Sequence, residues 1–201
     1  MRKIYIKEIL ENTSIGSDVV VRGWVRTKRN SKNVTFINVS DGTTIHTIQA
    51  VVEAETISDD LLAKINTGAC LEIQGQLIAS QGTQKVEVAV KNIIILGEAD
   101  AEKYPIQPKK HSFEFLREKA HLRPRTNTFG AILRIRHALA FAIHNYFNDQ
   151  GFFYLHTPII TGSDAEGAGE MFRVTTLDAT NPPKTEEGKI DYSQDFFGKE
   201  T

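Results

Sequence analysis

An acidic stretch that contains glycine, SDAEGAGEMF at residues 163–172, has the residue types of a ligand-binding loop. Glycine-rich loops commonly bind phosphate through exposed backbone amides. This stretch instead carries Asp164, Glu166 and Glu170 and has no cation before Arg173, so it suits phosphate poorly. Carboxylates on a flexible backbone attract an ammonium group. A solvated surface loop is the competing interpretation.

A second group of chemically useful residues lies in segments that alternate with a period of two. Alternation places successive side chains on opposite faces of a strand, here one apolar face and one polar face. The polar face carries Arg22, Trp24, Arg26 and Lys28 on the first segment, with Arg29 at its end, Phe36 on the second, Gln49 on the third and Glu87 on the last.

The side chains of this polar face are those that bind a short single-stranded nucleic acid. An aromatic ring stacks on a base, an amide and a carboxylate read base edges, and cations hold phosphates. The competing interpretation is that Phe36 covers one end of a barrel and that the charges are solvated. A glutamate among phosphates makes sense mainly as a reader of bases, so Glu87 favours recognition of specific bases.

The elements that must position these residues are predicted to form a β-barrel. Five alternating segments are separated by turn residues, and between the third and fourth a short helix begins at Ser58 and ends before Gly68. Three strands, a short helix and two strands is the order of an OB-fold barrel. The five segments are residues 18–29, 33–40, 44–53, 69–80 and 85–97.

The pattern changes beyond residue 97. Residues 98–111 contain charges and two prolines without an apolar period, which is typical of a linker. Residues 126–151 then have a helical apolar period, and residues 153–161, which include Pro158, predict a short strand at an edge or a strand end. The helical face consists of Ile132, Ile135, Leu139, Ile143 and Tyr146.

Composition restricts the classes of function. The formal net charge is -1, so the chain does not coat nucleic acid by bulk charge and any such contact must be focused. The single cysteine, Cys70, excludes a disulfide framework. Without a targeting segment or a membrane-spanning run, we expect a cytoplasmic protein that does not contact the membrane. The histidines lack zinc-site spacing, so we expect no metal; they are His46, His111, His121, His137, His144 and His156.

Several stretches together closely resemble the bacterial asparaginyl-tRNA synthetases, in the aspartyl, asparaginyl and lysyl subgroup of class II. The stretches are GWVRTKRNS, VTFINVSDG, IQAVV, KKHSFEFLREKAHLRPRTNTFGAILRIRHALA, GFFYLHTPIITGSDAEGAGEMFRVTTLD and GKIDYSQDFFGKET. The resemblance implies an OB-fold anticodon-binding domain at residues 1–97, a hinge at 98–111, and at 112–201 the incomplete start of an α+β class II catalytic domain.

The resemblance also implies roles for single residues. Phe36 resembles the ring that stacks on the central anticodon base, Gln49 and Glu87 resemble the readers of its neighbours, and Arg29 resembles a cation near the anticodon backbone. Pro158 matches the proline of motif 1, which builds the dimer interface in this family. In the loop that closes over the amino acid, Glu166 lies near the substrate's α-ammonium and Ser163 supports it.

The family's motifs 2 and 3, with their catalytic arginines, have no match in this sequence, so we expect no catalytic residue in this chain. The parent enzyme is expected to join asparagine to tRNA-Asn with ATP and Mg²⁺, as a homodimer. The chain alone is expected to be inactive, to bind neither ATP nor Mg²⁺ tightly, and to be limited to binding the anticodon of tRNA.

Two alternative assignments remain open. One is a free-standing OB-fold nucleic-acid-binding protein, and the other is a fragment of an aspartyl-tRNA synthetase, although HLRPRT and EGAGEMF favour the asparaginyl family. Arg123 and Arg125 within HLRPRT also allow two interpretations. They form either a hinge contact to the tRNA backbone or an ion pair at a domain interface, and we favour the ion pair.

Overall fold

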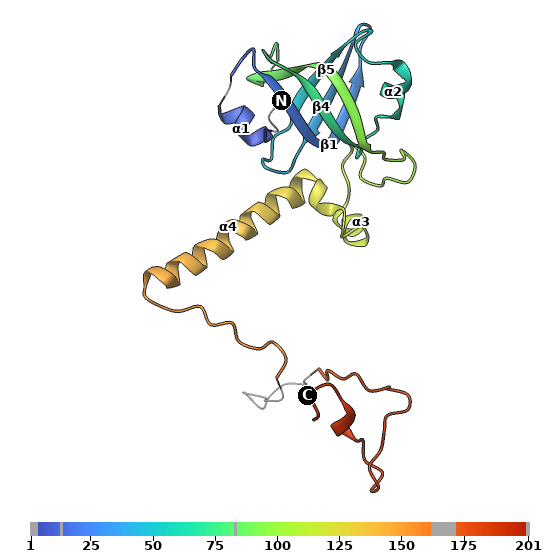
Figure 1. Cartoon of the computed structure of the whole chain (residues 1–201), viewed down its shortest axis with the longest axis vertical. Coiled ribbons are helices and arrows are strands. Elements are labelled where there is room, and N and C mark those ends of the chain that lie inside the picture. Colours follow the sequence, from blue (N-terminus) through green and yellow to red (C-terminus); the bar gives the residue numbers. More distant parts are fainter. Residues whose placement is uncertain (1–3, 13, 83, 162–171, 200–201) are drawn as a thin grey trace. The chain divides into compact units, whose positions relative to one another are not determined.

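The computed structural model describes residues 4–12, 14–82, 84–161 and 172–199. The chain divides into two units, residues 1–141 and residues 142–201, and each is described by itself. Figure 1 shows the barrel and the long helix α4. None of the helices among the described residues has the length and apolar character needed to cross a membrane.

The first unit contains a closed five-stranded barrel, which confirms the predicted OB-fold. The strands lie in the order β1-β2-β3-β5-β4, and only β3 and β5 pair in parallel. A short helix, α2 at Asp59–Lys64, connects β3 to β4, and Ser58 accepts a hydrogen bond from the Leu61 amide as its predicted cap. The strands are β1 Asp18–Asn30, β2 Val34–Ser40, β3 Ile48–Glu53, β4 Cys70–Ala79 and β5 Val86–Gly97.

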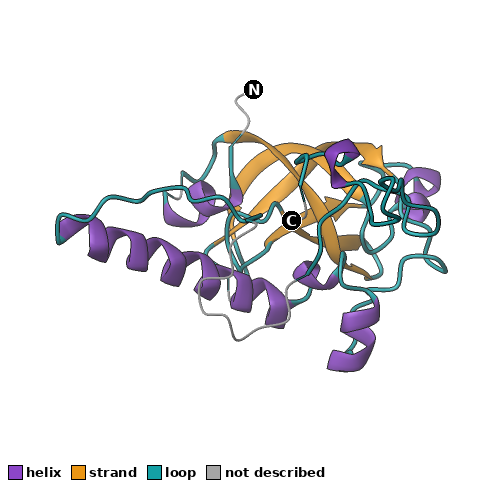
Figure 2. Ribbon diagram, turned by 90° about the horizontal axis from the view of Figure 1, so that it is seen from below, coloured by secondary structure: helices purple, strands orange, loops and turns teal. Residues whose placement is uncertain are grey.

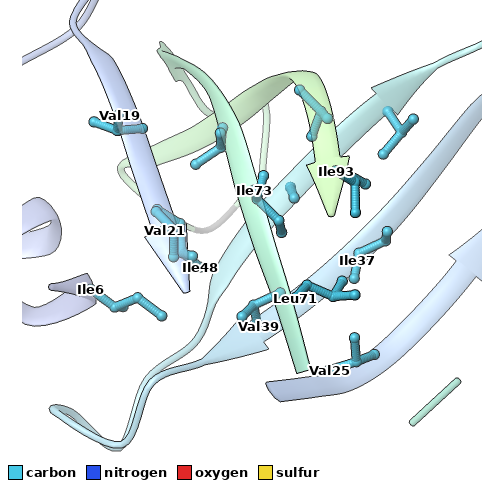
Figure 3. Packing of buried hydrophobic residues seen from close by; sticks show 14 of the residues in the cluster. Ile6, Val19, Val21, Val25, Ile37, Val39, Ile48, Leu71, Ile73 and Ile93 are labelled. Carbon is cyan, nitrogen blue, oxygen red and sulfur yellow. The ribbon is translucent and has the colours of Figure 1, made fainter. Parts of the chain in front are cut away.

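Alternating aliphatic side chains fill the barrel interior, as Figure 3 shows for Ile37, Val39 and Ile48. Burial of these side chains removes apolar surface from water and is the main source of stability. A further helix, α1 at Ile6–Glu11, adds Ile6 and Ile9 to the same core, and both are fully buried. This helix was not predicted because six residues show no clear period.

The first strand contains a β-bulge that changes which side chains share a face. Val25 pairs with Val39 but Thr27 pairs with Asn38, so Arg26 is the extra residue. After the bulge, Lys28 lies opposite the buried Ile37. The prediction that Lys28 shares the polar face is therefore wrong. Its ammonium group donates to the Leu62 carbonyl of α2 at 2.8 Å, and burial lowers the pKa of Lys28.

Close approach of the backbones requires a glycine where β4 meets β5. A Cβ atom at Gly75 would lie 2.2 Å from the carbonyl oxygen of Ala89. The register of the two strands shifts between Gln74 and Gly75. Only a residue without a side chain allows the strands to curve tightly at this point and to close the barrel.

Three helical segments follow the barrel: α3 at Phe113–Glu118, a 3-10 turn at Arg123–Arg125 and α4 at Asn127–Asp149. Gly151 has a φ of 85°, which suits a glycine just after a helix end, as predicted. Along α4 no residue is buried, so the predicted apolar face is exposed to solvent in this chain.

The second unit contains no strand among its described residues, and residues 152–158 have no regular structure. Figure 2 likewise shows strands only in the barrel. The predicted strand at 153–161 is therefore wrong. A strand requires a hydrogen-bonding partner, and Pro158 cannot donate to one. Local order in this unit comes instead from Asp195, which is 7% exposed and accepts hydrogen bonds from the amides of Thr176 and Phe196.

Candidate nucleic-acid interface

The register of the barrel aligns four polar residues in a row across its strands, which we call the polar row: Thr27, Asn38, Gln49 and Glu87. Thr27 pairs with Asn38, and Asn38 pairs with Gln49. The parallel pairing of Ala50 with Val88 then places Glu87 beside Gln49. Residues that are distant in the sequence thus form one continuous surface.

Hydrogen bonds hold the side chains of Gln49 and Glu87 in the polar row. The Gln49 amide nitrogen donates to Glu87 Oε1 at 2.8 Å, and the Ser80 hydroxyl donates to the same oxygen at 2.6 Å. Glu87 is only 6% exposed, and these two donors compensate the burial of its carboxylate. Because the Gln49 amide group donates here, its side-chain oxygen remains an acceptor. The side-chain oxygens of Gln49 and Glu87 can therefore accept hydrogen bonds from a ligand.

An aromatic ring and a guanidinium group lie two residues away along β1 and β2 from the pair of Thr27 and Asn38. Arg29 pairs with Phe36 between β1 and β2, and the guanidinium carbon lies 4.9 Å from the ring centroid. This distance is typical of a cation–π contact. Phe36 is half-buried, so the ring is held in place while part of it faces solvent. Such a ring can stack on a base.

A groove of about 1130 Å³ lies against the polar row. Its barrel wall includes Thr27, Arg29, Asn38, Gln49 and Glu87, and its other wall consists of residues 106–113 and 126–128. All of these residues belong to the first unit. The structure therefore brings three of the four predicted anticodon-binding residues, Arg29, Gln49 and Glu87, into one groove, and Phe36 contacts Arg29 beside it.

Three polar residues of this surface were missed from the sequence, and they are Thr27, Asn38 and Ser80. Asn38 donates to the Thr27 hydroxyl at 3.0 Å, and its position two residues after Phe36 was a usable signal because residues i and i+2 share a face. Ser80 follows the last residue of β4, where alternation no longer fixes the direction of a side chain. Only the three-dimensional structure reveals that Ser80 reaches Glu87.

Arg123 and Arg125 contact aromatic rings, and neither forms an ion pair in the described part of the chain. The guanidinium carbon of Arg125 lies 5.1 Å from the Trp24 ring centroid and 5.9 Å from that of Tyr104. The ion pair at a domain interface therefore stays a prediction, and within the described residues both side chains contact rings. Arg26 adds two hydrogen bonds beside these ring contacts, because its guanidinium donates to the Arg125 carbonyl and to Asn127 Oδ1. We call Trp24, Arg26, Tyr104 and Arg125 the linker clamp.

The remaining predicted site residues lie elsewhere. Ser163 and Glu166 fall outside the described residues. Pro158 is exposed in a segment without regular structure. Within the described ranges, no three His, Cys, Asp or Glu side chains are grouped so that they could hold a metal ion.

Two family models match the chain. An OB-fold nucleic acid binding domain matches residues 19–96, and the class II tRNA synthetases (D, K and N) match residues 112–184. The asparagine–tRNA ligase of Cytophaga hutchinsonii is 57% identical over 204 residues and covers the whole chain. That of Azobacteroides pseudotrichonymphae is 56% identical, also over the whole chain. The chain spans 44% of the length of each of these relatives.

Solved structures share the fold. The asparaginyl-tRNA synthetase from Pyrococcus horikoshii complexed with asparaginyl-adenylate matches 87% of this chain and 40% of its own, with a TM-score of 0.74 and 23% identity. That of Entamoeba histolytica matches the same shares with a TM-score of 0.72 and 20% identity. Over residues 112–184 the chain therefore matches the class II tRNA synthetases, and over its whole length it matches asparagine–tRNA ligases.

Proposed function

We propose that this chain is part of an asparagine–tRNA ligase and that its barrel binds the anticodon of tRNA-Asn. The reaction joins asparagine to tRNA at the expense of ATP, with AMP and pyrophosphate as products. The single observation that best supports the anticodon role is the acceptor pair of Gln49 and Glu87, which is fixed by hydrogen bonds beside the ring of Phe36. The reaction is supported by the whole-length similarity to the asparagine–tRNA ligases of Cytophaga hutchinsonii and Azobacteroides pseudotrichonymphae.

The acceptors suit the bases of the asparagine anticodon. The codons AAC and AAU pair with the anticodon GUU, which contains only guanine and uracil. Both bases carry N–H donors on their Watson–Crick edges, whereas adenine and cytosine carry a ring-nitrogen acceptor at the corresponding place. The side-chain oxygens of Gln49 and Glu87 accept hydrogen bonds from the N–H groups of guanine or uracil. The same oxygens repel the ring-nitrogen acceptor of adenine or cytosine. Discrimination thus follows from buried groups that only the correct base can satisfy.

The substrates below are proposed for the longer enzyme of which this chain is a part. ATP and Mg²⁺ are proposed as the substrate and the cofactor that the parent enzyme uses with asparagine. Asparagine is proposed to bind through Glu166 with support from Ser163. Pro158 is proposed to lie in the interface of a homodimer, in a cytoplasmic enzyme.

Removal of the stacking ring tests the anticodon role. Phe36→Ala should weaken binding of an RNA hairpin with the anticodon GUU by about 5- to 150-fold, since base stacking on an aromatic ring contributes about 1–3 kcal/mol. Fluorescence anisotropy at fixed salt measures the change. Phe196→Ala serves as the control because Phe196 is also an exposed ring, 77% accessible, but lies outside the barrel.

The wild-type chain should also bind the GUU hairpin more tightly than a GUC hairpin, which carries the aspartate anticodon. Equal affinity for both, together with no effect of Phe36→Ala, would contradict the proposed function.

A further inference from the structure

Two adjacent lysines, Lys109 and Lys110, lie on the wall of the groove that faces the polar row. Both are exposed, and neither forms an ion pair with any of the described residues. The sequence pattern assigned these residues only to a linker. Their charges therefore point to a ligand that the protein itself does not provide.

The backbone that carries the two lysines is ordered by a buried side chain and by local hydrogen bonds. Ile106 is buried at 7% exposure, and the Gln107 side chain donates to the Tyr104 carbonyl at 2.8 Å. The Lys109 amide donates to the Gln107 carbonyl at 2.7 Å, which makes a tight turn. A ring nitrogen of His111 contacts the same carbonyl at 3.1 Å. The ammonium groups are thus carried by an ordered turn, at a lower entropic cost of binding than on a free tail.

The groove is more positive than the protein around it. Its lining contains Arg26, Arg29, Lys109 and Lys110 but only one carboxylate, that of Glu87, in a chain with a formal net charge of -1. Arg26 is already bound to the Arg125 carbonyl and to Asn127, and Arg29 lies over Phe36. Lys109 and Lys110 form no ion pair or side-chain hydrogen bond within the described residues, so their ammonium donors are available to a ligand. A focused patch of this kind attracts a polyanion.

We propose that Lys109 and Lys110 bind backbone phosphates of the RNA strand whose bases contact the polar row. This inference rests on the proposed function, because it takes the strand to be the anticodon arm. When bases face the barrel, the sugar–phosphate backbone faces away from it, toward the opposite wall of the groove. Contacts to phosphate position a strand without reading its sequence, whereas contacts to base edges supply specificity. In this arrangement the polar row contacts the bases, and the wall with Lys109 and Lys110 binds the phosphates.

The double variant Lys109→Gln/Lys110→Gln tests this arrangement. Affinity for the GUU hairpin should fall about 5- to 20-fold at about 50 mM salt, and the slope of log K against log salt should become shallower by about 1.4, which is two phosphates at about 0.7 each for a single strand. The preference for GUU over GUC should not change. Titration of labelled hairpins at four salt concentrations gives all three quantities.

The matched control is Lys32→Gln/Lys64→Gln, which removes the same charge from two exposed lysines that do not line the groove. An unchanged slope in the groove variant, or an equal change in the control, would overturn the proposal. Failure of the proposed function would look different, because the wild-type chain would then show no preference for GUU. If the lysines instead serve an acidic protein partner, RNA binding stays at the wild-type level in the groove variant, which also overturns the proposal.

Discussion

At the scale of single residues, hydrogen bonds on the barrel surface hold the side chains of Gln49 and Glu87 in place before any ligand binds. The carboxylate of Glu87 is 6% exposed, yet two neutral donors, Gln49 and Ser80, compensate it. A carboxylate held in this way does not need to reorganise when a base arrives, so less free energy is lost on binding. In the proposed anticodon role, this prior orientation of Gln49 and Glu87 lowers the cost of binding a base.

Asp195 provides a prediction on pH. Hydrogen bonds from Thr175, and from the amide and hydroxyl of Thr176, lower the pKa of Asp195 from 3.8 to about 2. The folded state therefore favours the charged form, and the stabilisation is fully present above pH 3.8 and is lost as the pH falls toward 2. NMR titration of the Thr176 amide should give a midpoint near 2.

The variant Asp195→Asn should abolish that titration of the Thr176 amide. A midpoint near the ordinary value of 3.8 in the wild-type chain would show that the hydrogen bonds do not hold in solution. An amide of β5, which lies in the other unit, serves as the reference for general unfolding.

The predictability of single residues depends on how regular their strand is. Phe36, Gln49 and Glu87 lie in strands whose alternation is unbroken at these positions, and their outward direction was predicted from parity alone. Lys28 follows a bulge, and one inserted residue reverses the parity of everything beyond it. A bulge depends on pairing with the neighbouring strand, which a single sequence does not display.

At the scale of elements, the OB-fold was predictable because its five strands each carry their own alternation and turn residues. The short strand predicted at 153–161 was wrong because pairing is not a local property: residues 152–158 have no partner within the described residues and adopt no regular structure. The N-terminal helix α1 was missed for a related reason. Its place is set by the core that receives Ile6 and Ile9, not by any pattern of its own.

The closure of the barrel at Gly75 can be tested by adding one methyl group. In Gly75→Ala the new Cβ would overlap the Ala89 carbonyl at 2.2 Å, so the strands must move apart. The free energy of unfolding should fall by about 1–3 kcal/mol, the usual effect of overpacking. Urea denaturation followed by circular dichroism measures it.

Gly97→Ala is the matched control, because its Cβ would meet nothing nearer than 3.8 Å. It should change the free energy of unfolding by less than about 0.5 kcal/mol. If both variants unfold at the same urea concentration as the wild-type chain, the barrel tolerates a side chain at Gly75 and the argument for tight closure fails.

At the scale of the whole molecule, the linker is attached to the barrel by the linker clamp. Tyr104 lies against Gly68, where a Cβ would be 2.7 Å from its ring. Arg125 contacts the rings of both Tyr104 and Trp24. None of these contacts was predictable from the sequence, because they join residues 24, 68, 104 and 125 across four separate segments. The clamp fixes the wall that carries Lys109 and Lys110 relative to the polar row.

Loss of the clamp should loosen the linker without unfolding the barrel. Each cation–π contact at an exposed site contributes about 0.5–1 kcal/mol, so Arg125→Ala should weaken attachment of the linker by about 1–2 kcal/mol. Amide hydrogen exchange should become faster in residues 104–126 and stay unchanged in β2 and β4.

Arg117→Ala is the control, because Arg117 forms only an exposed pair with Glu114 on α3. It should leave exchange in residues 104–111 unchanged. Faster exchange throughout the barrel in Arg125→Ala would show that the residue supports the core instead of the linker.

The parallel pairing of β3 with β5 has a consequence for folding. Gln49 and Glu87 meet only through this pairing, and α2 and the whole of β4 lie between them in the chain. Contacts between distant segments carry a high entropic cost and form late. A chain that is collapsed but not yet closed therefore has no acceptor pair, so it gains no specific affinity for RNA. Under the proposed function, binding of RNA through this pair would report on completed folding.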